Sequence, residues 1–392
     1  MTLCHARRHI KPALVLALAC SFGCAGPSRQ KPPSVAKHPT SQEKAHRFEL
    51  APWVVTPTSA ATVDEICDRG MHHFAVGEFE EADQDLGLCV RVAPGSPNTP
   101  VAMYYHAIAL DQLGRLEAAL EQFNTVAGGP GDHAMRQAAS LRAVRLACHL
   151  ERWDIARKRA ELLLQGSRRL SPLDTVLVRG ALALDAVFHG DDARAELHVG
   201  HARTLIEEHH LDAPGKIARD VAAVYFALGE IRRIRGERIT LVPVPRFAEV
   251  LERRCELILA AQSAYSDAMR ALDAHWSMMS GFRIGELYGK LHQELMQMPL
   301  PQNAKTPAQR QLFEGAMRLR YSVLVQKALR MIEQTLAMAE RTGETSQWVD
   351  RARAAARDLQ QRLQDEQMAI ERLPYSREAL ESALHELVER SH

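Results

Sequence analysis

Two cysteines of this 392-residue chain are spaced so that they could form a disulfide. Cys67 lies 10 residues before Gly77, and Cys89 lies 12 residues after it. In an antiparallel helical hairpin that turns at Gly77, both sulfur atoms fall at nearly the same level. Such a bridge would stabilise the fold by roughly 3 kcal/mol in an oxidising compartment. The alternative is two free thiols that pack as small apolar side chains, as expected for Cys148 and Cys255.

The histidines offer a second chemistry, metal binding. His198 and His201 are three residues apart on an expected helix, while His72-His73 and His209-His210 are adjacent pairs. Zinc needs three or four converging ligands, and adjacent side chains on a helix point apart. Neither an HExxH motif nor a CxxC pair occurs. We therefore expect solvated histidines, no metal site and no cofactor.

Sequence motifs that carry catalysis are missing from the chain. It has no GxSxG, no Walker loop and no glycine-rich dinucleotide turn after a strand. An enzyme would need a site assembled from scattered residues, within about 240–310. Lys and Arg number 49 against 48 Asp and Glu, which argues against nucleic-acid binding. The sequence predicts a protein that is not an enzyme.

The N-terminus predicts export and a lipid anchor. Arg7, Arg8 and Lys11 precede the apolar run 13–20, and together residues 1–23 are expected to be a signal peptide. The end of this segment resembles a bacterial lipobox, which implies that Cys24 is lipidated with acyl chains such as palmitate. Cys20 is a second candidate for lipidation. An ordinary secretory signal, or a start codon placed too early, would also account for this segment.

The next segment, 24–62, is expected to be the lipidated cysteine and a flexible tether. It is rich in proline and has few apolar residues that could form a core. Resemblance to bacterial lipoproteins implies an outer-membrane anchor, because Ala25 and not Asp follows Cys24. The folded part is then expected to face the periplasm.

Small residues recur at a regular interval after the tether. Ala82, Ala119 and Ala156 stand 37 residues apart, and Ala195 follows after 39. With Gly70 before the first turn, this pattern resembles the tetratricopeptide (TPR) repeat, which implies antiparallel helix hairpins packed in a row. Residues 63–236 are expected to be this array, and the whole chain to be an all-α, TPR-like solenoid.

A stacked array of this kind binds other proteins. The repeat register places five residues near the inner groove: Tyr104, Asp111, Arg145, His149 and Phe188. This mixture of aromatic, acidic and basic side chains would suit an extended peptide or a helix of a partner. The alternative is that single members are solvated or help neighbouring hairpins to pack.

The last part, 237–392, is expected to be helical but not periodic, with breaks at Pro299, Pro301, Pro307 and Pro374. The segment 283–288 and the residues after it resemble the C-terminal module of TPR lipoproteins in bacterial gliding-motility machinery. This resemblance implies a scaffold that connects envelope proteins of a multi-protein complex. The alternatives are a scaffold for outer-membrane protein insertion, pilus assembly or secretion, or a hydrolase of envelope polymers.

Overall fold

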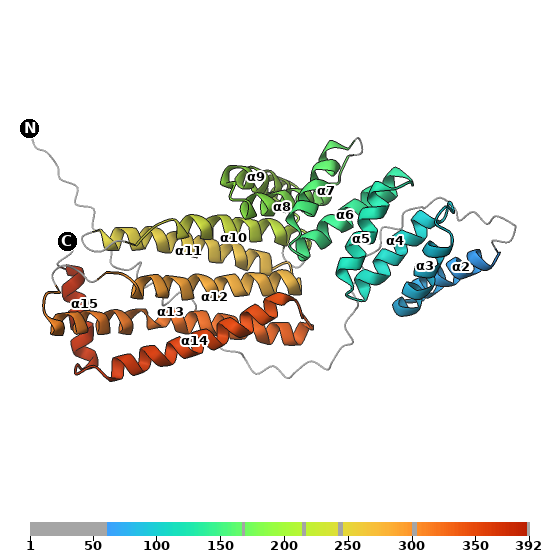
Figure 1. Cartoon of the computed structure of the whole chain (residues 1–392). Coiled ribbons are helices and arrows are strands. Elements are labelled where there is room, and N and C mark those ends of the chain that lie inside the picture. The colour runs from blue at the N-terminus through green and yellow to red at the C-terminus, as the bar shows by residue number, and fades with distance from the viewer. Residues whose placement is uncertain (1–60, 167–168, 214–216, 242–245, 300–303, 390–392) are drawn as a thin grey trace, which may run out of the picture. The chain divides into compact units, whose positions relative to one another are not determined.

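The computed structural model describes residues 61–166, 169–213, 217–241, 246–299 and 304–389. Within these ranges it contains fourteen helices and no strand (Figure 1). The helices are α2 (Ala61–Val76), α3 (Phe79–Val92), α4 (Thr99–Gln112), α5 (Leu116–Gly128), α6 (His133–His149), α7 (Trp153–Gln165), α8 (Pro172–Phe188), α9 (Asp192–Glu208), α10 (Val221–Glu237), α11 (Phe247–Met269), α12 (Ala274–Met296), α13 (Pro307–Thr342), α14 (Gln347–Glu371) and α15 (Arg377–Glu389). None of these helices combines the length and hydrophobicity that crossing a bilayer requires. The expected signal peptide, Cys24 and nearly all of the tether lie outside the described residues.

Four tight turns of one type separate the paired helices from α2 to α9. The turn residues have positive φ angles of 87°, 73°, 57° and 76°, and they are Gly77, Gly114, Glu151 and Gly190. After each turn, the next backbone N–H donates to a carbonyl five residues back, as Glu78 does to His73 O at 2.9 Å. This hydrogen bond closes the C-terminus of the first helix. The turns therefore repeat in geometry as well as in sequence.

The four recurring alanines lie where the two helices of each hairpin touch. All four side chains have 0% exposure. Gly70 serves the same purpose on α2, because a Cβ atom there would lie 2.9 Å from Leu86 of α3. Each helix from α2 to α9 packs on the next one in the chain (Figure 1). The fold is thus the predicted all-α, TPR-like solenoid of antiparallel hairpins.

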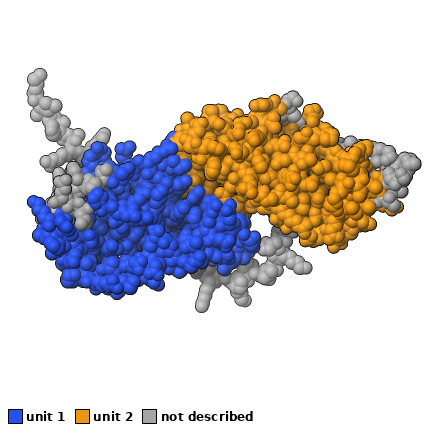
Figure 2. Space-filling model, in the orientation of Figure 1, with its two compact units in different colours: residues 1–41, 232–263, 278–392 blue, residues 42–231, 264–277 orange. Residues whose placement is uncertain are grey.

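The chain divides into two compact units, coloured orange and blue in Figure 2. Of the described residues, the orange unit holds those up to 231 together with 264–277, and the blue unit holds 232–263 and those from 278 onward. The sequence predicts that the array ends at residue 236, and the orange unit's main stretch ends at residue 231. Residues 264–277 join the array because Tyr265 and Trp276 pack their rings 5.4 and 5.5 Å from Phe226 of α10.

In the blue unit, α12 packs closely against its neighbours through glycines. A Cβ atom at Gly285 would lie 2.5 Å from Ile332 of α13, and one at Gly281 would overlap Thr335. Helix α13 begins with a capping box, in which the Thr306 side chain and Gln309 each accept a backbone hydrogen bond from the other residue. The predicted breaks near Pro307 and Pro374 match the start of α13 and the end of α14.

Candidate functional site

A small polar pocket opens in the array between α4, α6 and the residues before α10. It is lined by Asp111, Arg142, Arg145, Leu146, His149 and Arg219, and we call it the α4–α6 pocket. Three of the five predicted groove residues, Asp111, Arg145 and His149, therefore lie around one opening. The repeat register brings them together because each stands near the C-terminus of a first helix in its hairpin.

Arg142 connects a fourth predicted residue to this pocket. Its guanidinium lies 3.9 Å from the Asp111 carboxylate, and its Nε donates to the Tyr104 hydroxyl at 3.3 Å. The Tyr104 side chain itself is only 5% exposed, with its ring edge-on to Phe123. Tyr104 is therefore a core residue whose hydroxyl accepts a hydrogen bond from Arg142. Its ring is buried, whereas the sequence predicts that it lies in the groove.

Arg145 and Arg219 of the pocket lining form ion pairs with acidic residues that follow them in the chain. Arg145 donates to both carboxylate oxygens of Asp220, at 2.9 and 2.8 Å. Arg219 lies 2.6 Å from the Asp273 carboxylate. Each guanidinium thus has an acidic partner within the orange unit. These pairs fix the pocket wall, which favours the alternative that Arg145 helps neighbouring segments to pack.

His149 is also used inside the molecule. Its ring stacks on that of His275, with ring centres 3.6 Å apart and planes 24° from parallel. His275 is 3% exposed, so the face of the His149 ring that lies against it is not available to a partner. Of the charged side chains that line the pocket, Arg219 is the most exposed at 51%, whereas Asp111 and Arg145 are each 25% exposed.

Phe188 lies elsewhere. It stands at the end of α8 with 68% exposure, and its ring centre is 6.1 Å from that of Trp153 at the start of α7. Neither residue lines the α4–α6 pocket. The repeat register predicts Phe188 near the groove residues, whereas its ring lies beside Trp153 and away from the α4–α6 pocket lining.

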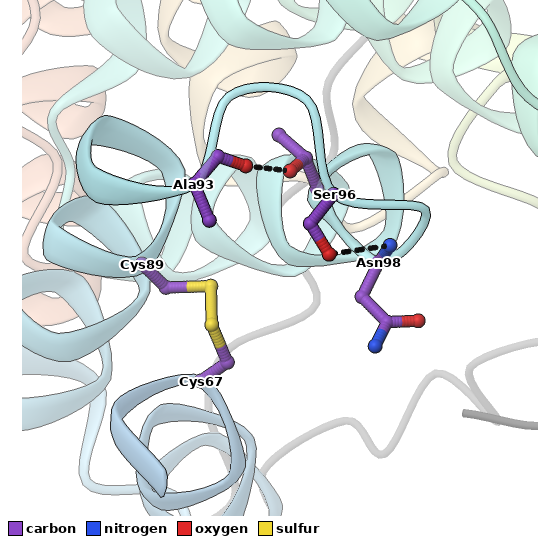
Figure 3. Close-up of a disulfide and its surroundings, with 6 residues drawn as sticks. Cys67, Cys89, Ala93, Ser96 and Asn98 are labelled. Atoms are coloured by element: carbon purple, nitrogen blue, oxygen red, sulfur yellow. Dashed lines mark hydrogen bonds between the residues drawn. A yellow bond between two sulfur atoms is a disulfide. The ribbon is translucent and has the colours of Figure 1, made fainter. Parts of the chain in front are cut away.

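The structure joins Cys67 and Cys89 in a disulfide between α2 and α3 (Figure 3). Both cysteines are buried in a cluster with Ala82, Leu86 and Ala102. The turn after α3 is closed by a hydrogen bond from Ser96 N–H to Ala93 O at 3.1 Å. A second one runs from Asn98 N–H to Ser96 Oγ at 3.2 Å (Figure 3). The first hairpin is therefore held by a covalent bond as well as by packing.

The two other described cysteines are buried thiols. Burial raises the pKa of Cys148 to about 12, with the nearby Asp220 carboxylate acting in the same direction. Burial also raises the pKa of Cys255 to about 11. Neither thiol is a nucleophile at neutral pH, since only the thiolate reacts.

Sequence reasoning missed several members of the α4–α6 pocket. Arg142 stands three residues before Arg145, so helical spacing places both on one face and could have identified it. Arg219 lines the pocket from the segment before α10, and Asp220 and His275 pair with the lining residues Arg145 and His149. Their partners are up to 126 residues away in the chain, and no local pattern connects them.

No protein-family model matches the chain, and no curated protein matches it. Among solved structures, the chain is similar to the TPR domain of P58(IPK), determined at 2.5 Å, with 15% identity over 84% of this chain and 98% of that one. The TM-score is 0.25, which is too low to carry an argument. The TPR-like fold therefore rests on the repeated hairpins themselves, and this architecture is that of a protein–protein interaction scaffold.

Proposed function

We propose that this protein is a membrane-anchored scaffold that binds other proteins of the bacterial envelope through its hairpin array. The observation that carries this proposal is the row of four hairpins with the same type of turn and buried alanines. Arrays of this kind present extended surfaces to partner segments. The array's own helices are well packed, so the partner-binding surface is formed in advance.

The Cys67–Cys89 disulfide supports a location outside the cytoplasm. Disulfides persist in oxidising compartments such as the periplasm and are rare where thiols are kept reduced. We place the protein at the outer membrane, attached through Cys24 and facing the periplasm. Replacing Cys24 by Ser should move the protein from the membrane fraction to the soluble fraction. Replacing Cys20 by Ser is the matched control and should leave the distribution unchanged. Unaltered sedimentation of the Cys24 variant would contradict the anchor.

The α4–α6 pocket is the proposed docking point for a partner segment. Its lining carries charges of both signs, which include the Asp111 carboxylate, 3.9 Å from Arg142, and the Arg219 guanidinium, 2.6 Å from Asp273. A partner that carries a base and an acid at matching positions would pair with both. Exposed ion pairs contribute little energy each, so they select the partner and its orientation more than they add affinity.

Site-directed photo-crosslinking in intact cells tests this docking point. A crosslinking amino acid at Asp111 should capture one or a few envelope proteins. The matched control is the same crosslinking amino acid at Arg203, which is exposed on α9 in the fourth hairpin and does not line the pocket. It should capture these envelope proteins less. Equal capture from both positions would remove the pocket as the docking point.

The finer proposal is that the complex is a gliding-motility apparatus. It depends on the resemblance of the segment 283–288 and the following helices to the TPR lipoproteins of such machinery. Deletion of the gene should then abolish gliding, and the crosslinked partners should be motility proteins. Capture of secretion, pilus or protein-insertion components would instead assign the scaffold to one of those systems.

A further inference from the structure

We propose that Asp154, Asp185 and His189 bind one divalent transition-metal ion, with Zn²⁺ as the best fit. This site goes beyond the scaffold function and lies within the orange unit, between the start of α7 and the end of α8. One ligand atom of each residue lies within 4.8 Å of those of the other two. Three groups at this separation can meet on one ion with small side-chain movements.

Asp185 is the residue that most strongly indicates a cation site. Its side chain is 2% exposed, and its two oxygens have different surroundings. Oδ2 faces the guanidinium groups of Arg194 and Arg157, at 3.3 and 3.7 Å. Oδ1 lies 3.2 Å from Nδ1 of His189 but accepts no hydrogen bond from the described residues. A buried carboxylate oxygen without a donor is costly, and a cation next to Oδ1 would remove that cost.

His189 is held in the orientation that metal-binding histidines adopt. Its Nδ1 lies 2.9 Å from the backbone oxygen of Asp185, to which only a protonated nitrogen can donate. The lone pair is then on Nε2, the nitrogen available to a metal. A backbone hydrogen bond to the other ring nitrogen is the usual support of a histidine ligand. Because Asp185 and His189 are four residues apart, both lie on one face at the end of α8.

Asp154 supplies the third ligand from the neighbouring hairpin. Its side chain is 71% exposed and His189 is half exposed, so an ion can enter from solvent. Two carboxylates and one imidazole suit Zn²⁺, whereas Ca²⁺ and Mg²⁺ prefer oxygen ligands alone. Three protein ligands leave a fourth position for water. Arg157 lies 3.8 Å from Asp154 and 3.7 Å from Asp185, so it balances the carboxylates without metal and competes with the ion.

Isothermal titration of the metal-free full-length protein with ZnCl₂ tests the site. We expect one Zn²⁺ per chain. His189→Gln and Asp154→Asn should each weaken binding by at least about 10- to 100-fold, because loss of a group that only supports a ligand already costs this much. His201→Gln, on the exposed face of α9, is the matched control and should leave binding unchanged. Identical titrations of the wild type and His189→Gln would overturn the proposal.

A fourth variant distinguishes this site from general attraction of cations to acidic groups. Arg157→Gln removes the competing charge and should tighten Zn²⁺ binding several-fold. Adding His189→Gln to that variant should abolish the gain. Zn²⁺ should also raise the melting temperature of the wild type but not of His189→Gln, while circular dichroism verifies that the variant is folded. A gain that survives in the double variant would show that the ion binds elsewhere.

Discussion

Asp220, which precedes α10, shows how a single ion pair connects the segment after the fourth hairpin to helix α6. Its carboxylate is 8% exposed and accepts two hydrogen bonds from Arg145, which stands 75 residues earlier. A planar guanidinium suits this two-point contact better than any other side chain. The free energy of the pair depends on both partners being present, because a buried charge left alone is strongly destabilising.

Replacing Arg145 by Gln should therefore destabilise the protein. The Asp220 carboxylate would stay buried without its cation, and we expect a loss of about 2 kcal/mol, below the value for a fully buried pair because Arg145 is partly exposed. Urea denaturation measures the change. Arg203→Gln removes the partner of the exposed Glu207 and is the matched control, with an expected loss below about 0.5 kcal/mol. Equal losses in the two variants would contradict this account.

His198 should make stability depend on pH. Burial lowers its pKa to about 4, and the charges of Arg179, Arg194 and His201 act in the same direction, against Asp191. The His198 imidazole takes up a proton near pH 6.5 in the unfolded chain but only near pH 4 in the folded chain. The stability that neutral His198 contributes is therefore fully present above pH 6.5 and is lost as the pH falls toward 4. His198→Gln keeps an acceptor for Arg179 and should flatten the stability curve between these values.

Denaturation at a series of pH values measures this effect. His72→Gln removes an exposed histidine of α2 and is the matched control, which should keep the slope of the wild type. The hypothesis fails if the His198 variant loses as much stability on acidification as the wild type does.

Some residues of the α4–α6 pocket could be located from the sequence because the helix hairpins repeat at a regular interval. Asp111 and His149 stand near the ends of equivalent helices, so the repeat brings them to one opening. Tyr104 was expected in the groove, but α4 is buried on nearly all sides and its tyrosine enters the core. Contacts such as His149 with His275 join segments without a shared period, and the sequence does not encode them locally.

At the scale of elements, the turns decide where each hairpin folds back. Glycine adopts positive φ without strain, whereas another residue loses about 1–2 kcal/mol there. Gly190 turns α8 into α9 with a φ of 76°, while Gly200 lies in the exposed middle of α9, and a Cβ atom at either position would meet nothing within 4 Å. The two glycines therefore differ in backbone conformation alone.

Alanine at these two positions should have opposite effects. Gly190→Ala should cost about 1 kcal/mol because of backbone strain, and Gly200→Ala should gain about 0.5–1 kcal/mol because alanine favours a helix. Urea denaturation of both variants measures the difference. Unchanged or higher stability of Gly190→Ala would mean that the φ angle at residue 190 does not require glycine.

The hairpins were predictable because each has its own local signals. The third turn carries Glu151 where the others carry glycine, yet it adopts the same positive φ, since the flanking helices pack as in the other repeats. The close approach at Gly281 and Gly285 was not predicted. Glycine inside a helix is locally unfavourable, and only the neighbouring helix α13 explains its presence.

At the scale of the molecule, the sequence motif behind the gliding resemblance is mainly core. In the segment 283–288, Ile284, Gly285, Leu287 and Tyr288 are buried, and Lys327 donates to the Tyr288 hydroxyl at 2.7 Å. A similar segment in another protein therefore indicates similar packing. Partner identity has to be read from exposed residues, as the crosslinking experiment does.

Gly285→Ala should test whether the blue unit is a separate cooperative unit. The added methyl group would overlap Ile332, and overpacking of this kind costs about 1–3 kcal/mol. Hydrogen exchange should show lost protection in α12 and α13, while the helices from α2 to α9 keep theirs. Gly200→Ala is the matched control, because it adds the same methyl group to open space. Uniform loss of protection across all helices would indicate a single cooperative unit.

The disulfide of the first hairpin determines how the proposed scaffold would carry mechanical load. If Cys24 is anchored, tension from the membrane enters the folded part through α2. At Cys67 the covalent path crosses directly to Cys89, near the end of α3, so residues 68–88 and the turn at Gly77 lie outside the path of the force. Pulling cannot peel α2 from α3 beyond that point, and the load passes to the interface of α3 with α4. A reduced protein should therefore extend by an additional hairpin length at low force in a single-molecule pulling experiment.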